Sequence, residues 1–248
     1  MSTTKLTRKE ISADPIHDAL IQGIETVRSR AKLLGVIAAG MVVLALAIYF
    51  GLGYLDARDK ASQQDLAKAM DFFHAQIDAN AKGDPYAMGP MPTFANEKAR
   101  YTAAAEAFAA TASRYGSSKI GAMARYYLGL CQIQLGQKSE AMATLEAATK
   151  NTADRTVAYL AKKVLASYCV ETGDAKRGQE ILQGMLKDPQ CDLPKEDLQV
   201  NLSRALMAQG KRSEALKVLQ DAQDAGGGGM LQSLVFQEMN RIQNSSGN

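Results

Sequence analysis

Histidines, cysteines and carboxylates are the residues of this sequence that could carry catalytic or metal-binding chemistry. The two histidines, His17 and His74, lie on opposite sides of a long apolar stretch, and the acidic residues are scattered along the chain. The sequence has no H-E-x-x-H, paired C-x-x-C or G-x-S-x-G motif, so zinc, dithiol and serine chemistry are not indicated. We therefore predict no enzymatic activity, no metal site and no cofactor, and the sequence points to a function in binding.

The three cysteines, Cys131, Cys169 and Cys191, are too few for a disulfide framework, and their number is odd. We expect Cys131 and Cys169 to act as small buried apolar residues. An oxidising compartment would permit one bridge, and the sequence leaves the pairing of Cys131 with Cys169 open.

The longest apolar stretch, 33–55, holds 23 residues without a single charge. As a helix it would extend about 35 Å at ~1.5 Å per residue, enough to cross a hydrocarbon core of about 30 Å. A soluble core helix of this length would show a polar face, which this stretch lacks. A cleaved signal peptide is the alternative, but its apolar core is shorter and lies closer to the start of the chain. We predict a single transmembrane helix.

The orientation of this helix follows from the segment before it. Arg28, Arg30 and Lys32 precede the helix closely, and an equal number of basic residues follows it. Short tails obey the positive-inside rule, whereas long domains translocate largely regardless of charge. We therefore place the tail, 1–32, in the cytoplasm and the remainder of the chain outside it.

The tail is expected to contain a short amphipathic helix. Asp14 and Pro15 form a helix start, with an N-cap oxygen followed by proline at the first helical position. Apolar residues then recur at helical spacing, at Ile16, Leu20, Ile24 and Val27. This helix would lie on the inner leaflet or dock a partner, and both alternatives remain open.

Residues 56–248 are nearly neutral, with 23 basic and 22 acidic residues. The absence of a basic stripe argues against nucleic-acid binding. Abundant alanine favours helices, so the expected fold class is all-α. A juxtamembrane helix and a Pro/Gly loop are predicted over 56–92, with the helix continuing the membrane helix as far as about Ala81. Thr93 is expected to cap the next helix, which would end at about Tyr115.

A repeat with a period of 37 residues follows over 93–225. Four columns recur: Leu128, Leu165 and Leu202; Gly136, Gly173 and Gly210; Ala141, Gly178 and Ala215; Leu145, Leu182 and Leu219. A fixed period in this range indicates stacked supersecondary units. Each copy is interpreted as a helix, a turn at the column glycine, and a second helix. The small third-column residue lets the two helices approach, and the fourth-column leucine fills the space between them.

These residues resemble the tetratricopeptide repeat. Leu128, Gly129, Gly136, Ala141, Leu145 and Ala148 match its pattern at the usual offsets, as do Leu202, Gly210, Ala215, Leu219 and Ala222. The middle copy departs from it, with Ala166 for the first glycine and Gly178 for the alanine. The resemblance implies a helical solenoid that follows the N-terminal transmembrane helix.

The resemblance also implies a binding surface, because the first helix of each tetratricopeptide repeat lines the concave side. Carried over by position, it gives Met123, Tyr126, Leu130 and Ile133, then Leu160, Lys163, Ser167 and Val170, then Asp197, Val200, Arg204 and Met207. Most of these residues are large and apolar, as in a groove that binds a protein. The alternative is a groove filled by the C-terminal helix or by the juxtamembrane helix.

Residues 226–248 close the array. Gly226 to Gly229 are predicted to form a flexible joint, and a P-loop is excluded because no Lys-Ser/Thr follows them. The apolar spacing of the residues after them predicts a capping helix. The last five residues are expected to be frayed.

The order of these segments resembles the YfgM-like family of bacterial inner-membrane proteins, which carry a periplasmic repeat domain. The resemblance implies an interaction scaffold that is an ancillary subunit of the Sec translocon and works with a periplasmic prolyl-isomerase-like chaperone. It implies contact with the bilayer through 33–55 and no small-molecule substrate. Two alternatives remain: a scaffold for another envelope assembly or cell-division machine, and a regulator that signals through its cytoplasmic tail.

Overall fold

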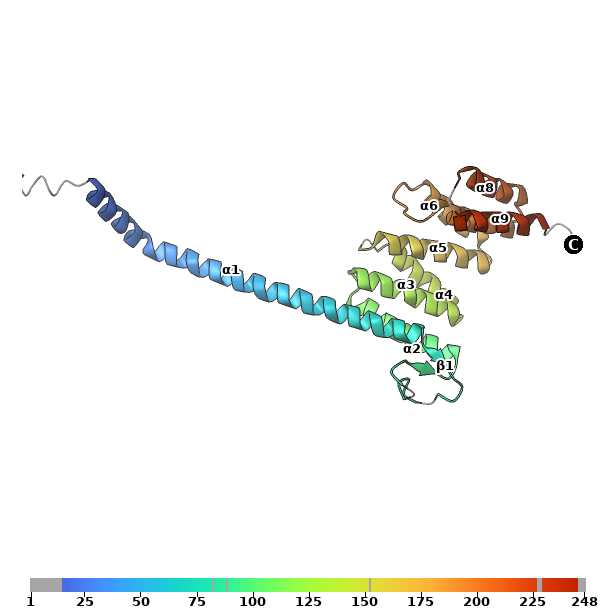
Figure 1. Cartoon of the computed structure of the whole chain (residues 1–248), viewed down its shortest axis with the longest axis horizontal. Helices are drawn as coiled ribbons and strands as arrows, with labels where there is room; N and C mark the ends of the chain where they lie inside the picture. Colours follow the sequence, from blue (N-terminus) through green and yellow to red (C-terminus); the bar gives the residue numbers. More distant parts are fainter. Residues whose placement is uncertain (1–14, 82, 88, 152, 227–228, 245–248) are drawn as a thin grey trace, which may run out of the picture. The chain divides into compact units, whose positions relative to one another are not determined.

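The computed structural model describes residues 15–81, 83–87, 89–151, 153–226 and 229–244 (Figure 1). Within residues 15–34, side chains are described only at positions 23, 24, 28 and 33. The chain divides into two compact units, 1–60 and 61–248. The described residues are almost entirely helical, which confirms the all-α fold class.

The first helix, α1 (Pro15–Phe73), contains 59 residues without interruption. It passes through the apolar stretch 33–55, as the sequence predicts, and the proposed N-cap, Asp14, lies outside the described residues. Every side chain from 35 to 60 is exposed. A helix that is both apolar and exposed on all sides has the length and composition needed to cross a membrane.

The end of α1 differs from the sequence analysis, because the helix stops at Phe73 and does not continue to Ala81. Two short strands replace its last turns: β1 (Gln76–Ile77) pairs in parallel with β2 (Thr93–Phe94). The backbone N–H of Gln76 donates to Pro92 O at 3.1 Å, a long-range bond that competes with helix continuation. The ring of Phe72 packs against that of Phe94, with centroids 5.6 Å apart.

Helix α2 (Glu97–Arg114) begins after this loop. Its cap is Asn96, whose side chain accepts a hydrogen bond from Ala99 N at 2.9 Å, so the assignment of the cap to Thr93 was wrong. Residues 61–73 of α1 pack on α2 in the same compact unit. There Asp65 accepts hydrogen bonds from Arg114 at 2.7 Å and from Tyr115 at 3.0 Å.

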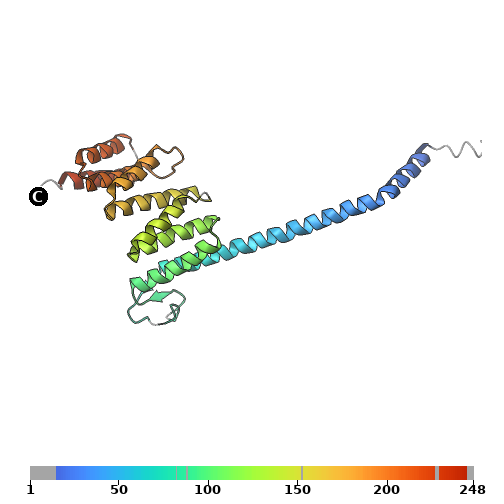
Figure 2. The ribbon, with the colours of Figure 1, turned by 180° about the vertical axis from the view of Figure 1, so that it is seen from behind.

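Six helices follow as three helix–turn–helix pairs that succeed one another along the stack (Figure 2). The pairs are α3 (Lys119–Gln134) with α4 (Lys138–Thr149), α5 (Arg155–Glu171) with α6 (Ala175–Lys187), and α7 (Lys195–Ala208) with α8 (Arg212–Asp224). The turn glycines Gly136, Gly173 and Gly210 have φ values of 71°, 96° and 75°. This is the left-handed conformation predicted for them, which glycine adopts without steric cost.

The seam inside each pair is built from the predicted columns. Leu145, Leu182 and Leu219 are each 0 % exposed. The departure of the middle copy has a steric reason: a Cβ added to Gly178 would lie 2.7 Å from Ala166 O. In the first copy, by contrast, it is Gly129 that has no room, because its Cβ would lie 2.7 Å from Leu145. The glycine therefore moves from the first helix of one pair to the second helix of the next.

Helix α9 (Gly229–Asn244) closes the stack by packing on α7 and α8. Val235 and Ile242 are fully buried in the same apolar cluster as Leu206 and Leu219, as expected of a capping helix. Gly226 and Gly229 both have positive φ. The centre of the predicted glycine joint, 227–228, and most of the predicted frayed end lie outside the described residues.

Candidate protein-interaction surface

The twelve residues carried over from the tetratricopeptide pattern lie on α3, α5 and α7, the first helix of each pair. We call this surface the first-helix face. Val200 is 3 % exposed and Arg204 is exposed, and the other ten residues are half-buried. The face is thus covered in part by neighbouring first helices, and it is less open than a groove lined by exposed apolar residues.

Several apolar members contribute to packing between repeats. Tyr126 and Ile133 lie against the buried cluster that contains Leu145 and Leu165. Burial and the neighbouring Tyr127 raise the pKa of Tyr126 above its ordinary value. Val200 belongs to the core of the last two pairs, and Val170 and Met207 pack on that core. These five residues therefore contribute to the packing of the stack as well as to the first-helix face.

Met123, Leu130 and Leu160 differ from that group. Each is half-buried, and among the described residues none belongs to the three buried apolar clusters or packs against them. They are the apolar residues of the face that a partner could cover without disturbing the core. A partner surface of aliphatic side chains would gain stability there by removing apolar area from water.

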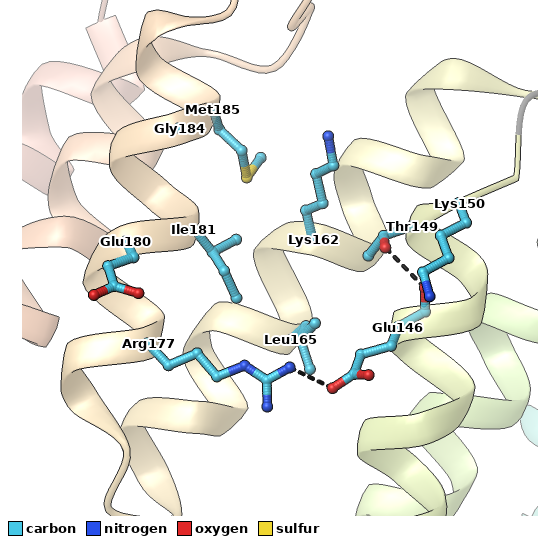
Figure 3. Close-up of a pocket in the computed structure, with 10 residues that line it drawn as sticks. All are labelled: Glu146, Thr149, Lys150, Lys162, Leu165, Arg177, Glu180, Ile181, Gly184 and Met185. Carbon is cyan, nitrogen blue, oxygen red and sulfur yellow. Dashed lines mark hydrogen bonds and ion pairs between the residues drawn. The ribbon is translucent and has the colours of Figure 1, made fainter.

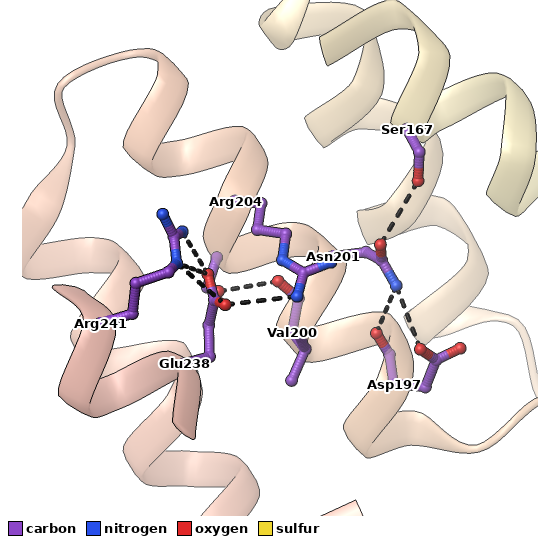
Figure 4. A network of polar contacts seen from close by, with 8 residues as sticks. Ser167, Asp197, Val200, Asn201, Arg204, Glu238 and Arg241 are labelled. Carbon is purple, nitrogen blue, oxygen red and sulfur yellow. Dashed lines mark hydrogen bonds and ion pairs between the residues drawn. The ribbon is translucent and has the colours of Figure 1, made fainter. Parts of the chain in front are cut away.

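Polar side chains connect the first helices across the face (Figure 4). Lys163 Nζ lies 2.8 Å from Asp197 Oδ2, and Ser167 Oγ donates to Asn201 Oδ1 at 3.3 Å. Asn201 Nδ2 in turn donates to the backbone oxygen of Asp197 at 2.7 Å. Both links between α5 and α7 join residues 34 positions apart. Equivalent residues of successive repeats are 37 positions apart. Each residue therefore contacts a partner about one helical turn N-terminal to its own equivalent in the next repeat.

A third link joins α7 to α9. Arg204 lies 3.3 Å from Glu238, again 34 positions away, and Arg241 holds the other oxygen of Glu238 at 2.5 Å. Glu238 is 4 % exposed. Burial alone would raise its pKa, but the hydrogen bonds from Arg241 and Arg204 outweigh burial, so the pKa lies below its ordinary value. Glu238 is therefore an ion in the folded protein, and α9 takes the place of a further first helix.

Sequence reasoning missed Asn201, Glu238 and Arg241 as members of this network. The 37-residue columns align equivalent positions, whereas contacts between adjacent first helices join positions 34 apart. A search for complementary polar residues at that second spacing would have found Lys163 with Asp197.

Cys131 and Cys169 are each 0 % exposed, which confirms the expected burial, and both are free thiols, a point that the sequence left open. Burial raises the pKa of Cys131 to about 12 and raises that of Cys169 above its ordinary value. Among the described residues, no group of three or more His, Cys, Asp or Glu side chains could hold a metal ion.

No protein-family model and no curated protein matches this sequence. Two solved structures of kinesin light chain TPR-like repeats from Podosopora anserina are similar in fold, each with 18 % sequence identity. One matches with a TM-score of 0.50 and the other with 0.49; both cover 60 % of this chain, and 79 % and 80 % of their own. At this identity the match to the first structure establishes the fold alone. The chain therefore combines one long apolar N-terminal helix with a TPR-like repeat stack.

Proposed function

We propose that this protein is a membrane-anchored interaction scaffold, with 33–55 crossing the bacterial inner membrane and the repeat stack binding proteins outside the cytoplasm. One observation carries the proposal. A single chain joins an apolar helix, exposed on all sides from 35 to 60, to a tetratricopeptide-like stack. Exposing such a helix to water would be costly, and a bilayer removes that cost.

The orientation rests on charge. Arg28, Arg30 and Lys32 favour a cytoplasmic location for the tail, 1–32, and on this basis the repeat stack is proposed to lie in the periplasm. The stack is nearly neutral, so its association with partners depends on packing and hydrogen bonds more than on long-range steering.

The first-helix face is the proposed binding surface. Met123, Leu130 and Leu160 supply apolar contacts, and the ion pairs at Lys163 and Arg204 supply polar ones. The remaining proposed residues, Tyr126, Ile133, Val170, Val200 and Met207, support the face from beneath by packing between the helices. Preorganisation by the Lys163–Asp197 and Arg204–Glu238 links reduces the entropy that binding would cost.

The proposed partners are subunits of the Sec translocon and a periplasmic prolyl-isomerase-like chaperone. Support comes from the order of segments, which resembles that of YfgM-like proteins: a short basic tail, one apolar helix and a few degenerate repeats. A scaffold beside a translocon needs a membrane anchor and a protein-binding domain on the side of the membrane where the translocated chain emerges. In this chain the apolar stretch 33–55 would supply the anchor and the repeat stack the binding domain.

Crosslinking with mass spectrometry in native membranes tests this assignment. Crosslinks from 61–248 to Sec subunits and to a prolyl-isomerase-like chaperone are the expected result. Crosslinks to outer-membrane assembly or cell-division proteins would replace the translocon with another envelope machine. Crosslinks confined to the tail and a cytosolic protein would contradict the scaffold proposal and favour a regulator.

A pair of variants tests the face itself. Leu130→Glu places a charge on the half-buried surface and should remove most of the crosslinks to the partner, because a buried unpaired carboxylate is unfavourable. Ala143→Glu, on an exposed position of α4, is the matched control and should leave them unchanged. Equal crosslinking by both variants, with both folded, would place the binding surface elsewhere.

A further inference from the structure

A second surface lies away from the first-helix face, in a groove of about 480 Å³ between α4, α5 and α6 (Figure 3). Its volume falls in the range of sites that hold a ligand or a peptide side chain. The lining residues are Glu146, Thr149, Lys150, Lys162, Leu165, Arg177, Glu180, Ile181, Gly184 and Met185.

One lining residue of the groove, Gly184, carries no side chain. A Cβ added to Gly184 would meet no atom within 4 Å, so this position of α6 faces empty space. The equivalent positions of the other two pairs hold Ala147 and Asp221, and only the middle pair leaves this point without a side chain. Arg177 of α6 forms an ion pair with Glu146 of α4 and links the two helices at one end of the groove.

The groove has an apolar base and basic side chains that carboxylates neutralise only in part. Leu165 and Met185 form buried parts of the lining, and Ile181 is half-buried. Within the described part of the chain, Lys150 and Lys162 form no ion pair, and Lys162 lies 4.6 Å from the centre of the Tyr159 ring. Figure 3 shows the Lys162 side chain extending between Met185 and Thr149.

We propose that this groove binds a segment of a partner protein in which a bulky aliphatic side chain lies next to an aspartate or glutamate. The aliphatic side chain fills the space at Gly184 over Ile181 and Met185, and the carboxylate is held by Lys150 and Lys162. The pairing follows from charge complementarity. Among the described residues Lys150 forms no ion pair, and Lys162 interacts with Asp188 only beyond ion-pair distance, so both ammonium groups beside the apolar base can bind a further carboxylate.

This site is additional to the first-helix face. Lys162 and Leu165 lie in the groove, whereas Lys163 and Ser167 belong to the first-helix face, so the two surfaces use different sides of α5. One repeat pair can thus hold two proteins at once. A lipid headgroup fits less well, because the apolar base and Glu180 offer nothing to a phosphate.

A phage-displayed library of random dodecapeptides, selected on the full chain in detergent micelles, tests the proposal. Selected sequences should carry Leu, Ile or Met within two positions of Asp or Glu. Their affinity should fall about tenfold or more on Gly184→Leu, which fills the groove, and several-fold on Lys150→Glu. Lys176→Leu, at an exposed position of α6 outside the groove, is the control and should bind as the parent does. Circular dichroism checks that each variant is folded.

Three results would overturn the proposal. The first is a selection without enriched sequences, and the second is binding that Gly184→Leu leaves unchanged. The third is binding of phosphatidylglycerol vesicles that Lys150→Glu abolishes while peptides do not bind, which would assign the two lysines to a lipid surface. Crosslinking at the first-helix face is independent of all three, so the proposed function would stand if the groove proposal failed.

Discussion

Replacing Gly178 with alanine tests the close approach of α5 and α6, and Gly184→Ala on the same helix provides its control. The added Cβ at Gly178 would lie 2.7 Å from both Ala166 O and Val170 Cγ2, closer than carbon atoms normally approach either. Gly184 has open space at the same point. Both substitutions replace glycine with alanine in the same helix and gain the same helix propensity. The difference between their free energies of unfolding therefore measures the steric effect alone.

The magnitude follows from two opposing terms. Glycine to alanine inside a helix stabilises by about 0.5–1 kcal/mol. Forcing an extra carbon into a packed seam costs about 1–3 kcal/mol. Gly184→Ala should therefore raise the free energy of unfolding by about 0.5–1 kcal/mol, and Gly178→Ala should lower it by about 0.5–2 kcal/mol, so the two diverge by about 1–3 kcal/mol.

Urea unfolding of residues 61–248, followed by circular dichroism, measures both variants. This segment contains all three buried apolar clusters, so we expect it to fold without the apolar helix. The slope of the free energy of unfolding against urea concentration should be the same for both variants and the parent, and only the unfolding midpoint should change. If Gly178→Ala is as stable as Gly184→Ala, the helices of the middle pair do not cross as closely as described, and the steric account of its glycine is wrong.

Three further predictions concern the same domain. Leu182→Ala should lower the free energy of unfolding by about 2–5 kcal/mol because the side chain is fully buried; an unchanged urea midpoint would refute the repeat register. Because the pKa of Glu238 is lowered on folding, its ionisation stabilises the protein fully above its ordinary pKa of 4.5, and this stabilisation is lost as the pH falls through the folded value. The charge-free Glu238→Gln should thus lose less stability than the parent between pH 6 and about pH 3, and equal losses in urea titrations would contradict the ion-pair account. A thiol reagent at pH 8 should modify Cys191 first, and Cys131 and Cys169 only on unfolding, because both are fully buried and their pKa values are raised; rapid native labelling of all three would show that the buried clusters open.

The repeat stack could be predicted from the sequence because its determinants are local and periodic. The turn glycines, the small residues and the seam leucines recur at one interval, and each copy imposes the same helix pair. The apolar stretch needed no tertiary information either, since its length and composition exceed what a soluble helix shows. The positions of the domain boundaries remain predictions.

The segment 74–96 could not be predicted in the same way. A helix was expected as far as about Ala81, but Ile77 is 45 % exposed and its backbone pairs with that of Phe94. The hydrogen bond from Gln76 N to Pro92 O joins residues separated by the whole Pro/Gly loop. The conformational preferences of neighbouring residues do not predict a pairing between segments so far apart in the sequence.

The positions of the first helices could be predicted, but the burial of the residues on them could not. Aligning equivalent positions located the first helices correctly, but it did not show which residues adjacent helices would cover. Val200 is buried, whereas Leu130 is half-buried. The ion pair between Arg204 and Glu238 forms because α9 occupies the position of a further first helix. The sequence of α9 departs from the repeat pattern, so the 37-residue columns did not predict this contact. Burial between repeats is a property of the stack and not of a single copy.

Protease added to spheroplasts that express the full chain measures the central claim most directly. The claim is that 33–55 anchors the protein in the inner membrane with the repeat stack outside the cytoplasm. The account predicts that the protein stays in the membrane fraction after alkaline carbonate washing and that protease degrades 61–248 while an epitope at the N-terminus survives. Deletion of 33–55 should release the stack from the membrane. A stack that remains intact in spheroplasts and becomes sensitive only after lysis would contradict the orientation, and release of the full chain by carbonate would contradict the anchor.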